Sequence, residues 1–161
     1  MKHTISAMVA NRPGVLARMS GLFARRGFNI DSLAVSTTED PNISRTTITV
    51  QGDEATLEQI CSQLGKLVDV IEVIDHTNDR YVERELCLCK VGCVTGNRSE
   101  LLDLVSIFRG DVVDVGDEEL MLEITGDEEK IDAFVRVMEP FGISEMVRTG
   151  KVLLVRGVNK T

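Results

Sequence analysis

Two asparagine residues flank one predicted helix, and the residue types around them suit the binding of a small amino acid. Asn11 precedes the helix in the run Asn-Arg-Pro-Gly, and Asn29 follows it, two residues after Gly27. The first N–H groups of a helix have no partner within it, and together with the helix dipole they favour a carboxylate. An asparagine carbonyl accepts hydrogen bonds from an ammonium group without adding charge. The two ends of this helix are therefore candidates for binding the two charged ends of a free amino acid.

The neighbouring residues complete this candidate site. Gly14 would let a ligand approach the backbone, and Pro13 lacks an N–H group only where none is needed. Apolar side chains beside them would shape a site for an aliphatic side chain. The candidate effector-binding residues are Asn11, Arg12, Pro13, Gly14, Val15, Leu16, Asn29, Ile30 and Asp31. The alternative interpretation is structural, because asparagine also favours helix starts and turns.

The sequence offers little support for catalysis or metal binding. His3 and His76 lie at predicted strand ends without a nucleophile motif nearby, and no phosphate-binding loop follows a strand. Cys87, Cys89 and Cys93 alternate along one predicted strand, without the turn that usually separates paired zinc thiolates. We therefore expect these cysteines to pack in a core. We expect no catalytic residue, metal site or cofactor in this chain.

The composition is that of an acidic globular protein. The chain of 161 residues is 43% apolar, enough to bury a core, and its formal net charge is −8. An acidic chain without a basic cluster is poorly suited to nucleic acid. The N-terminal apolar stretch is too short and polar for a signal peptide, and no apolar run approaches membrane-spanning length. We expect a cytosolic protein that binds neither nucleic acid nor membrane.

Hydrophobic periodicity predicts elements in the order β-α-β-β-α-β, followed by the same order again. Alternating runs predict strands near residues 3–10, 30–38, 44–51, 69–75, 82–93, 111–116, 119–125 and 143–149. Helical spacing predicts helices near residues 13–26, 53–66, 98–109 and 127–139. This order is typical of an α+β, ferredoxin-like layer with both helices on one face of an antiparallel sheet.

An internal repeat supports two tandem domains, 1–77 and 78–161. Residues 50–54 (VQGDE) correspond to residues 124–128 (ITGDE), so that Asp53 and Asp127 both occupy N-cap positions. The second half has Thr-Gly-Asn-Arg-Ser at 95–99 where the first has its Asn-Arg-Pro-Gly, so we expect no effector there. Its expected role is dimerisation or contact with a catalytic partner. A unit of about 75 residues is marginal alone, and its open sheet edges favour a homodimer.

The paired asparagine motifs resemble those of the ACT domain, a regulatory module that binds amino acids. Further motifs resemble successive signatures of the small regulatory subunit of acetolactate synthase (acetohydroxyacid synthase), over nearly the whole chain. These motifs are residues 38–45, 63–70, 82–86 and 107–110.

The resemblance implies a non-catalytic regulator of branched-chain amino acid biosynthesis. It implies a large catalytic subunit as partner, which holds thiamine diphosphate, FAD and Mg²⁺. The small subunit would activate that partner and confer feedback inhibition, with valine the usual effector. The effector would bind at the ACT dimer interface, between the first loop of one chain and the second strand of its partner. The hairpin around Pro41 is then expected near the catalytic subunit.

Two other functions fit the same layout. A tandem ACT sensor could regulate a different biosynthetic enzyme, but the signatures at 38–45 and 82–86 favour acetolactate synthase. An acylphosphatase-like enzyme would share the β-α-β-β-α-β order and carry an arginine in a glycine-rich loop after the first strand. The Pro13-Gly14 pair and the duplicated domain count against that enzyme.

Overall fold

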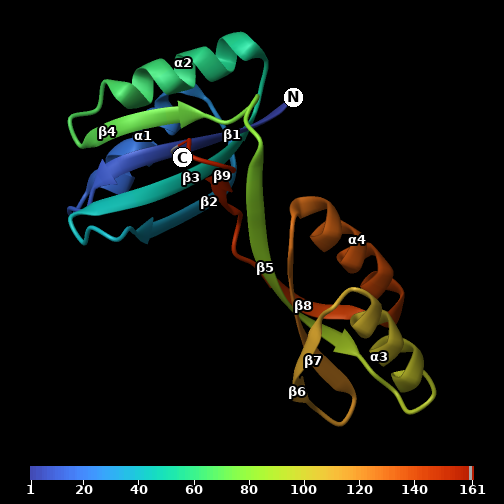
Figure 1. Ribbon diagram of the computed structural model, residues 1–161. Coiled ribbons are helices and arrows are strands. Elements are labelled where there is room, and N and C mark those ends of the chain that lie inside the picture. The colour runs from blue at the N-terminus through green and yellow to red at the C-terminus, as the bar shows by residue number, and fades with distance from the viewer. Residues whose placement is uncertain (160) are drawn as a thin grey trace. The chain divides into compact units, whose positions relative to one another are not determined.

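The computed structural model describes residues 1–159 and 161, which form two compact units (Figure 1). Unit 1 comprises Met1–Val82 and Val152–Thr161, and unit 2 comprises Glu83–Lys151. The expected ranges, 1–77 and 78–161, place the division slightly earlier. They also assign residues 152–161 to the second domain, whereas in the structure this segment belongs to unit 1.

Unit 1 is a ferredoxin-like layer with one antiparallel sheet in the strand order β2-β3-β1-β4. Helices α1 and α2 cover one face of this sheet (Figure 1). The elements are β1 (Lys2–Ala10), α1 (Val15–Arg26), β2 (Ile30–Thr37), β3 (Ile43–Gln51), α2 (Glu54–Gly65) and β4 (Val70–Asp75). All six predicted elements of the first half are thus confirmed.

Alternation along the strands decides what each face of this sheet presents. Ile5, Ala7 and Val9 of β1 point into the core, where the helical stripe Val15, Met19, Leu22 and Phe23 of α1 meets them. The other face of the sheet carries buried polar residues, two of which have side-chain partners. Ser32 Oγ donates to Thr49 Oγ1 at 3.1 Å, and His76 Nε2 lies 2.8 Å from Ser6 Oγ.

Unit 2 repeats the same order around a second sheet, β6-β7-β5-β8. Its elements are β5 (Tyr81–Gly92), α3 (Arg98–Ile107), β6 (Asp111–Val115), β7 (Glu119–Gly126), α4 (Glu128–Met138), a short 3-10 helix η1 (Glu139–Phe141) and β8 (Ile143–Arg148). Strand β5 begins in unit 1, and β9 (Val152–Val155) pairs with it. Neither η1 nor β9 was predicted from the periodicity.

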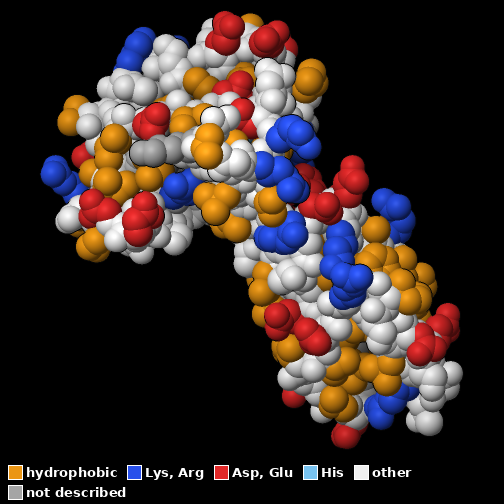
Figure 2. Space-filling view, in the orientation of Figure 1, with side chains coloured by type: hydrophobic (Ala, Val, Ile, Leu, Met, Phe, Trp, Pro, Cys, Tyr) orange, Lys and Arg blue, Asp and Glu red, His pale blue; other side chains and the backbone are white. Residues whose placement is uncertain are grey.

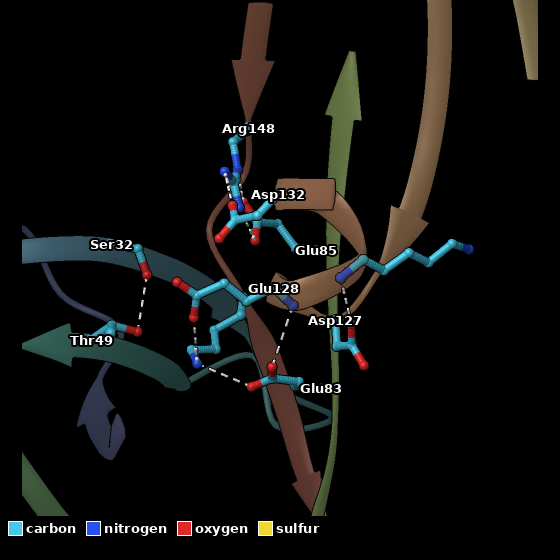
Figure 3. A network of polar contacts seen from close by, with 10 residues as sticks. Ser32, Thr49, Glu83, Glu85, Asp127, Glu128, Asp132 and Arg148 are labelled. Atoms are coloured by element: carbon cyan, nitrogen blue, oxygen red, sulfur yellow. Dashed lines mark hydrogen bonds and ion pairs between the residues drawn. The ribbon is translucent and has the colours of Figure 1, made fainter. Parts of the chain in front are cut away.

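The core of unit 2 contains the three alternating cysteines. Cys87, Cys89 and Cys93 are fully buried among apolar side chains of α3, α4 and β7, which confirms their predicted core packing. At the edge of this core, Arg148 bridges two carboxylates, with Nε 2.6 Å from Glu85 Oε1 and Nη1 2.7 Å from Asp132 Oδ1 (Figure 3). The hydrogen bonds to Glu85 are the main reason that the Arg148 pKa is raised.

Apolar side chains also reach the surface of both units (Figure 2). In unit 1 they include Leu16 of α1 and Val35 of β2, which are 46% and 44% exposed. None of the helices in residues 1–159 and 161 is long and apolar enough to cross a membrane.

Candidate effector site

The N-terminus of α1 has no side-chain cap from the described residues. Its N-cap, Gly14, has a left-handed backbone with φ +85°, and the Val15 N–H reaches the Arg12 carbonyl only at 3.5 Å. By contrast, α2 and α4 are capped by Asp53 and Asp127, whose carboxylates accept backbone N–H groups at 2.8 and 2.9 Å. The first turn of α1 therefore presents N–H groups to which an anion can bind.

A hollow of about 100 Å³ lies beside this uncapped helix end, between α1 and the helix-facing side of the sheet. It has space for several waters or one small side chain. Its apolar lining residues are Val9, Ala10, Val15, Leu16, Met19 and Val35. Its polar lining residues are Asn11, Arg12, Ser44 and Thr46. The hollow thus combines apolar walls with a few polar groups, as small-molecule sites usually do.

Asn11 fixes the loop that leads into α1. Its backbone N–H donates to the Asn42 carbonyl at 2.7 Å, and its side-chain Nδ2 donates to the Pro41 carbonyl at 2.9 Å. These bonds tie the loop to the hairpin between β2 and β3. Because the amide N–H is used in this way, the side-chain carbonyl of Asn11 is the group left to face a ligand.

Asn29, Ile30 and Asp31 lie at the opposite end of the sheet from this hollow. Ile30 pairs with Val50 of β3, whereas Ala10, next to Asn11, pairs with Ile43. Ile43 and Val50 are seven positions apart along β3, which is roughly 23 Å. In this chain Asn29 Nδ2 donates to Asp31 Oδ1 at 3.3 Å. One chain therefore cannot bring Asn11 and Asn29 onto the same amino acid, because the whole length of α1 lies between them.

Six residues of the hollow were not among the sequence-based candidates: Val9, Ala10, Met19, Val35, Ser44 and Thr46. Four of them are apolar and belong to no recognisable motif. Ser44 and Thr46 could have been recognised from the sequence. They are polar residues of β3 on the same face of the strand as the core residues Ile48 and Val50. Polar side chains at such positions require a partner or a ligand.

The first helix of unit 2 begins after a different loop. Its N-cap is Asn97, which makes no side-chain cap bond to α3; the Asn97 side-chain carbonyl instead accepts the Val94 N–H at 3.0 Å. Within residues 1–159 and 161, no group of three or more histidine, cysteine or acidic side chains is arranged to hold a metal ion.

Comparison with known proteins places both units in one family. Residues 5–72 match the family described as the AHAS small subunit-like ACT domain, and residues 84–157 match the small subunit of acetolactate synthase. A probable acetolactate synthase small subunit from Archaeoglobus fulgidus is 51% identical over 160 residues, 99% of this chain and 100% of that protein. An acetolactate synthase small subunit from Mycobacterium bovis is 48% identical, covering 96% of this chain and 92% of that protein.

A solved structure agrees with these sequence matches. The crystal structure of the acetolactate synthase small subunit from Thermotoga maritima has a TM-score of 0.89 and 42% sequence identity, over 98% of both chains. The fold and the matches define a tandem ferredoxin-like protein whose first unit is an ACT domain. The chain belongs to the family of acetolactate synthase small subunits, the regulatory subunits of that enzyme.

Proposed function

We propose that the chain binds a branched-chain amino acid, most strongly valine, and thereby confers feedback inhibition on the catalytic subunit of acetolactate synthase. When valine is absent, the chain raises the activity of that subunit, which holds the thiamine diphosphate, FAD and Mg²⁺ in the cytosol. The observation that carries the proposal is the uncapped α1 N-terminus at Gly14, beside an apolar hollow.

Each part of the amino acid has a matching group at this site. The carboxylate accepts hydrogen bonds from the first N–H groups of α1, where the helix dipole favours negative charge. The ammonium donates to the Asn11 carbonyl at the rim. The aliphatic side chain enters the hollow between Val15, Met19 and Val35. Gly14 has no Cβ that would narrow the approach to the backbone.

A two-fold dimer supplies the remaining residues. Strand β2 is an edge of the unit 1 sheet, and apolar Leu16 and Val35 are exposed beside it. If two β2 strands pair antiparallel across a two-fold axis, the start of one lies against the end of the other. Asn29 of the partner subunit is then near the Asn11 loop, although it lies far away within one chain. Ile30 and Asp31 of the partner subunit approach the same ligand.

Inhibition requires that valine bind one arrangement of the regulatory dimer more tightly than another. Only this differential affinity can shift the population of the catalytic subunit between states. A coupling free energy of roughly 1–3 kcal/mol corresponds to a change of several-fold to about a hundred-fold. A ligand that joins two protomers at their interface is suited to this role, because its contacts depend on the arrangement of the dimer.

The proposal is tested by comparing Gly14→Asp with Gly14→Asn in a complex reconstituted with the catalytic subunit. Both variants strain the left-handed backbone similarly, since aspartate and asparagine tolerate this conformation about equally. Only aspartate places a negative charge on the N–H groups that would bind the effector carboxylate. We expect the Gly14→Asp subunit to activate the catalytic subunit but to lose valine inhibition. The Gly14→Asn subunit should retain valine inhibition, weakened by a smaller factor.

The measurement is acetolactate formation across a valine titration, with dimer size checked separately. The small subunit alone serves as a blank and should form no acetolactate. If Gly14→Asp activates normally and remains as sensitive to valine as the parent, the effector does not bind at α1.

A further inference from the structure

Thr46 is a fully buried threonine whose hydroxyl has no hydrogen-bond partner. Its side chain is 0% exposed, and no donor or acceptor in the described part of the chain reaches Oγ1. On the other face of the same strand, buried Thr49 is bonded to Ser32 at 3.1 Å. Buried hydroxyl groups are normally paired, because an unpaired one loses its water without compensation. The unpaired Oγ1 therefore calls for an explanation.

Thr46 is one of the residues that line the hollow beside α1, and it is the most deeply buried of its polar lining residues. Val9, Val15 and Met19 around it are almost fully buried, whereas Asn11, Arg12 and Leu16 at the mouth are exposed. A bound amino acid keeps its carboxylate and ammonium at the mouth, since burying a charge costs far more than burying a methyl group. Its side chain then extends inward and ends against Thr46.

We propose that Thr46 is a specificity-determining residue of the effector site and that its hydroxyl hydrogen-bonds a hydroxyl group on the Cβ of the bound amino acid. This inference rests on the effector site proposed above and adds a second ligand to it. Threonine has nearly the shape of valine, but one methyl group is replaced by a hydroxyl that can both donate and accept. The site therefore binds threonine as well as valine.

The size of the effect follows from known discrimination between these two side chains. An apolar pocket prefers valine over threonine by only about a hundred-fold. The Thr46 hydroxyl stabilises bound threonine, whereas bound valine leaves Oγ1 unpaired as it is in the free chain, so the preference for valine is reduced. We expect the ratio of the threonine Kd to the valine Kd to be about ten or below.

The test uses Thr46→Val in the full-length chain, with Thr49→Val as the matched control. Both substitutions replace a buried threonine hydroxyl on β3 by a methyl group of similar shape, but Thr49 faces away from the hollow. Isothermal titration with L-valine and L-threonine gives both Kd values for each variant. We expect Thr46→Val to raise the threonine-to-valine Kd ratio by about tenfold or more, and Thr49→Val to leave it unchanged.

Thermal unfolding without ligand gives an independent readout. Thr46→Val removes a hydroxyl without a partner, so its Tm should equal or exceed that of the parent chain, whereas Thr49→Val breaks a bond and should lower the Tm. A Tm for Thr46→Val as low as that of Thr49→Val overturns the inference, because Oγ1 then has a structural role. If Thr46→Val binds valine but its threonine-to-valine Kd ratio equals that of the parent, the role of Thr46 is overturned and the effector site itself is not. A parent chain that binds neither amino acid overturns the effector site as well.

Discussion

At the scale of single residues, burial raises the thiol pKa of Cys61, Cys87 and Cys89. Burial raises the pKa of Cys89 to about 11, and it raises that of Cys87 although the Arg148 charge nearby opposes the change. Burial, with a smaller effect from the Asp75 carboxylate, raises the pKa of Cys61 to about 11. Since the thiolate is both the nucleophile and the metal ligand, these cysteines are poor candidates for either role at neutral pH.

We predict slow thiol chemistry in the native protein. At pH 8, a disulfide reagent should label Cys61 first, because its side chain is only partly buried, and should label Cys87, Cys89 and Cys93 only as the protein unfolds. Cys61→Ser should remove the faster phase, and denaturant should expose all four thiols. Metal analysis should find no stoichiometric zinc. Several fast thiols in the native state, or one zinc per chain, would contradict the packing of these residues.

The sequence predicts those candidate site residues that belong to a local motif. Gly14 and Asn11 stand in a recognisable strand-to-helix turn; Asn11 lines the hollow, and Gly14 is the N-cap of α1. Thr46 is different, because its importance depends on the absence of a partner. Nothing in the order of residues shows whether a threonine in a strand finds a partner, since that partner comes from a distant element, as Ser32 does for Thr49.

At the scale of elements, the sequence repeat correctly predicted the N-cap residues of α2 and α4. Asp53 and Asp127 occupy equivalent positions of the repeat, and each carboxylate accepts the backbone N–H three residues on. At Asp53 the Thr56 hydroxyl and backbone N–H, in that order, hold the pKa below its usual value of 3.8. The cap of α2 is therefore strongest when this carboxylate is ionised.

This gives a prediction for acid stability. Because the Asp53 pKa is lower in the folded chain than in the unfolded chain, its stabilising contribution is complete above pH 3.8 and is lost as the pH falls through the folded value. Asp53→Asn retains a cap but cannot ionise. In urea unfolding from pH 6 to pH 2.5, the stability gap between the parent and Asp53→Asn should shrink at the acid end. If the difference in unfolding free energy between the parent and Asp53→Asn does not change with pH, ionisation of the Asp53 carboxylate does not stabilise α2.

The elements that were not predicted share a physical cause. Strand β9 has only four residues without alternation, and its pairing with β5 joins segments far apart in the sequence. Its Leu153 is nevertheless buried. The separation of Asn11 from Asn29 was readable in principle, because a helix of 12 residues is about 18 Å long and holds its flanking residues apart. Which chain supplies each asparagine is a property of the assembly, so one chain's periodicity cannot show it.

At the scale of the whole molecule, the proposed site belongs to two chains. Each effector site takes the Asn11 loop and Gly14 from one protomer and Asn29 from the other, so a dimer has two equivalent sites. Hydrodynamic mass should accordingly show a dimer. Gly14→Asp and Asn29→Ala should each abolish valine binding in a dimer of identical chains, since every site then contains the changed residue.

A mixed dimer of one Gly14→Asp chain and one Asn29→Ala chain separates sites built across two chains from sites built within one. If each site uses residues of both protomers, one site combines the two defects and the other contains an intact loop and an intact Asn29. Differently tagged chains, co-expressed and purified through both tags, should then bind one valine per dimer, where the parent dimer binds two and either variant alone binds none. Calorimetric stoichiometry measures this directly. If the mixed dimer binds no valine although the parent does, Asn29 acts within its own chain, against its position at the far end of the sheet.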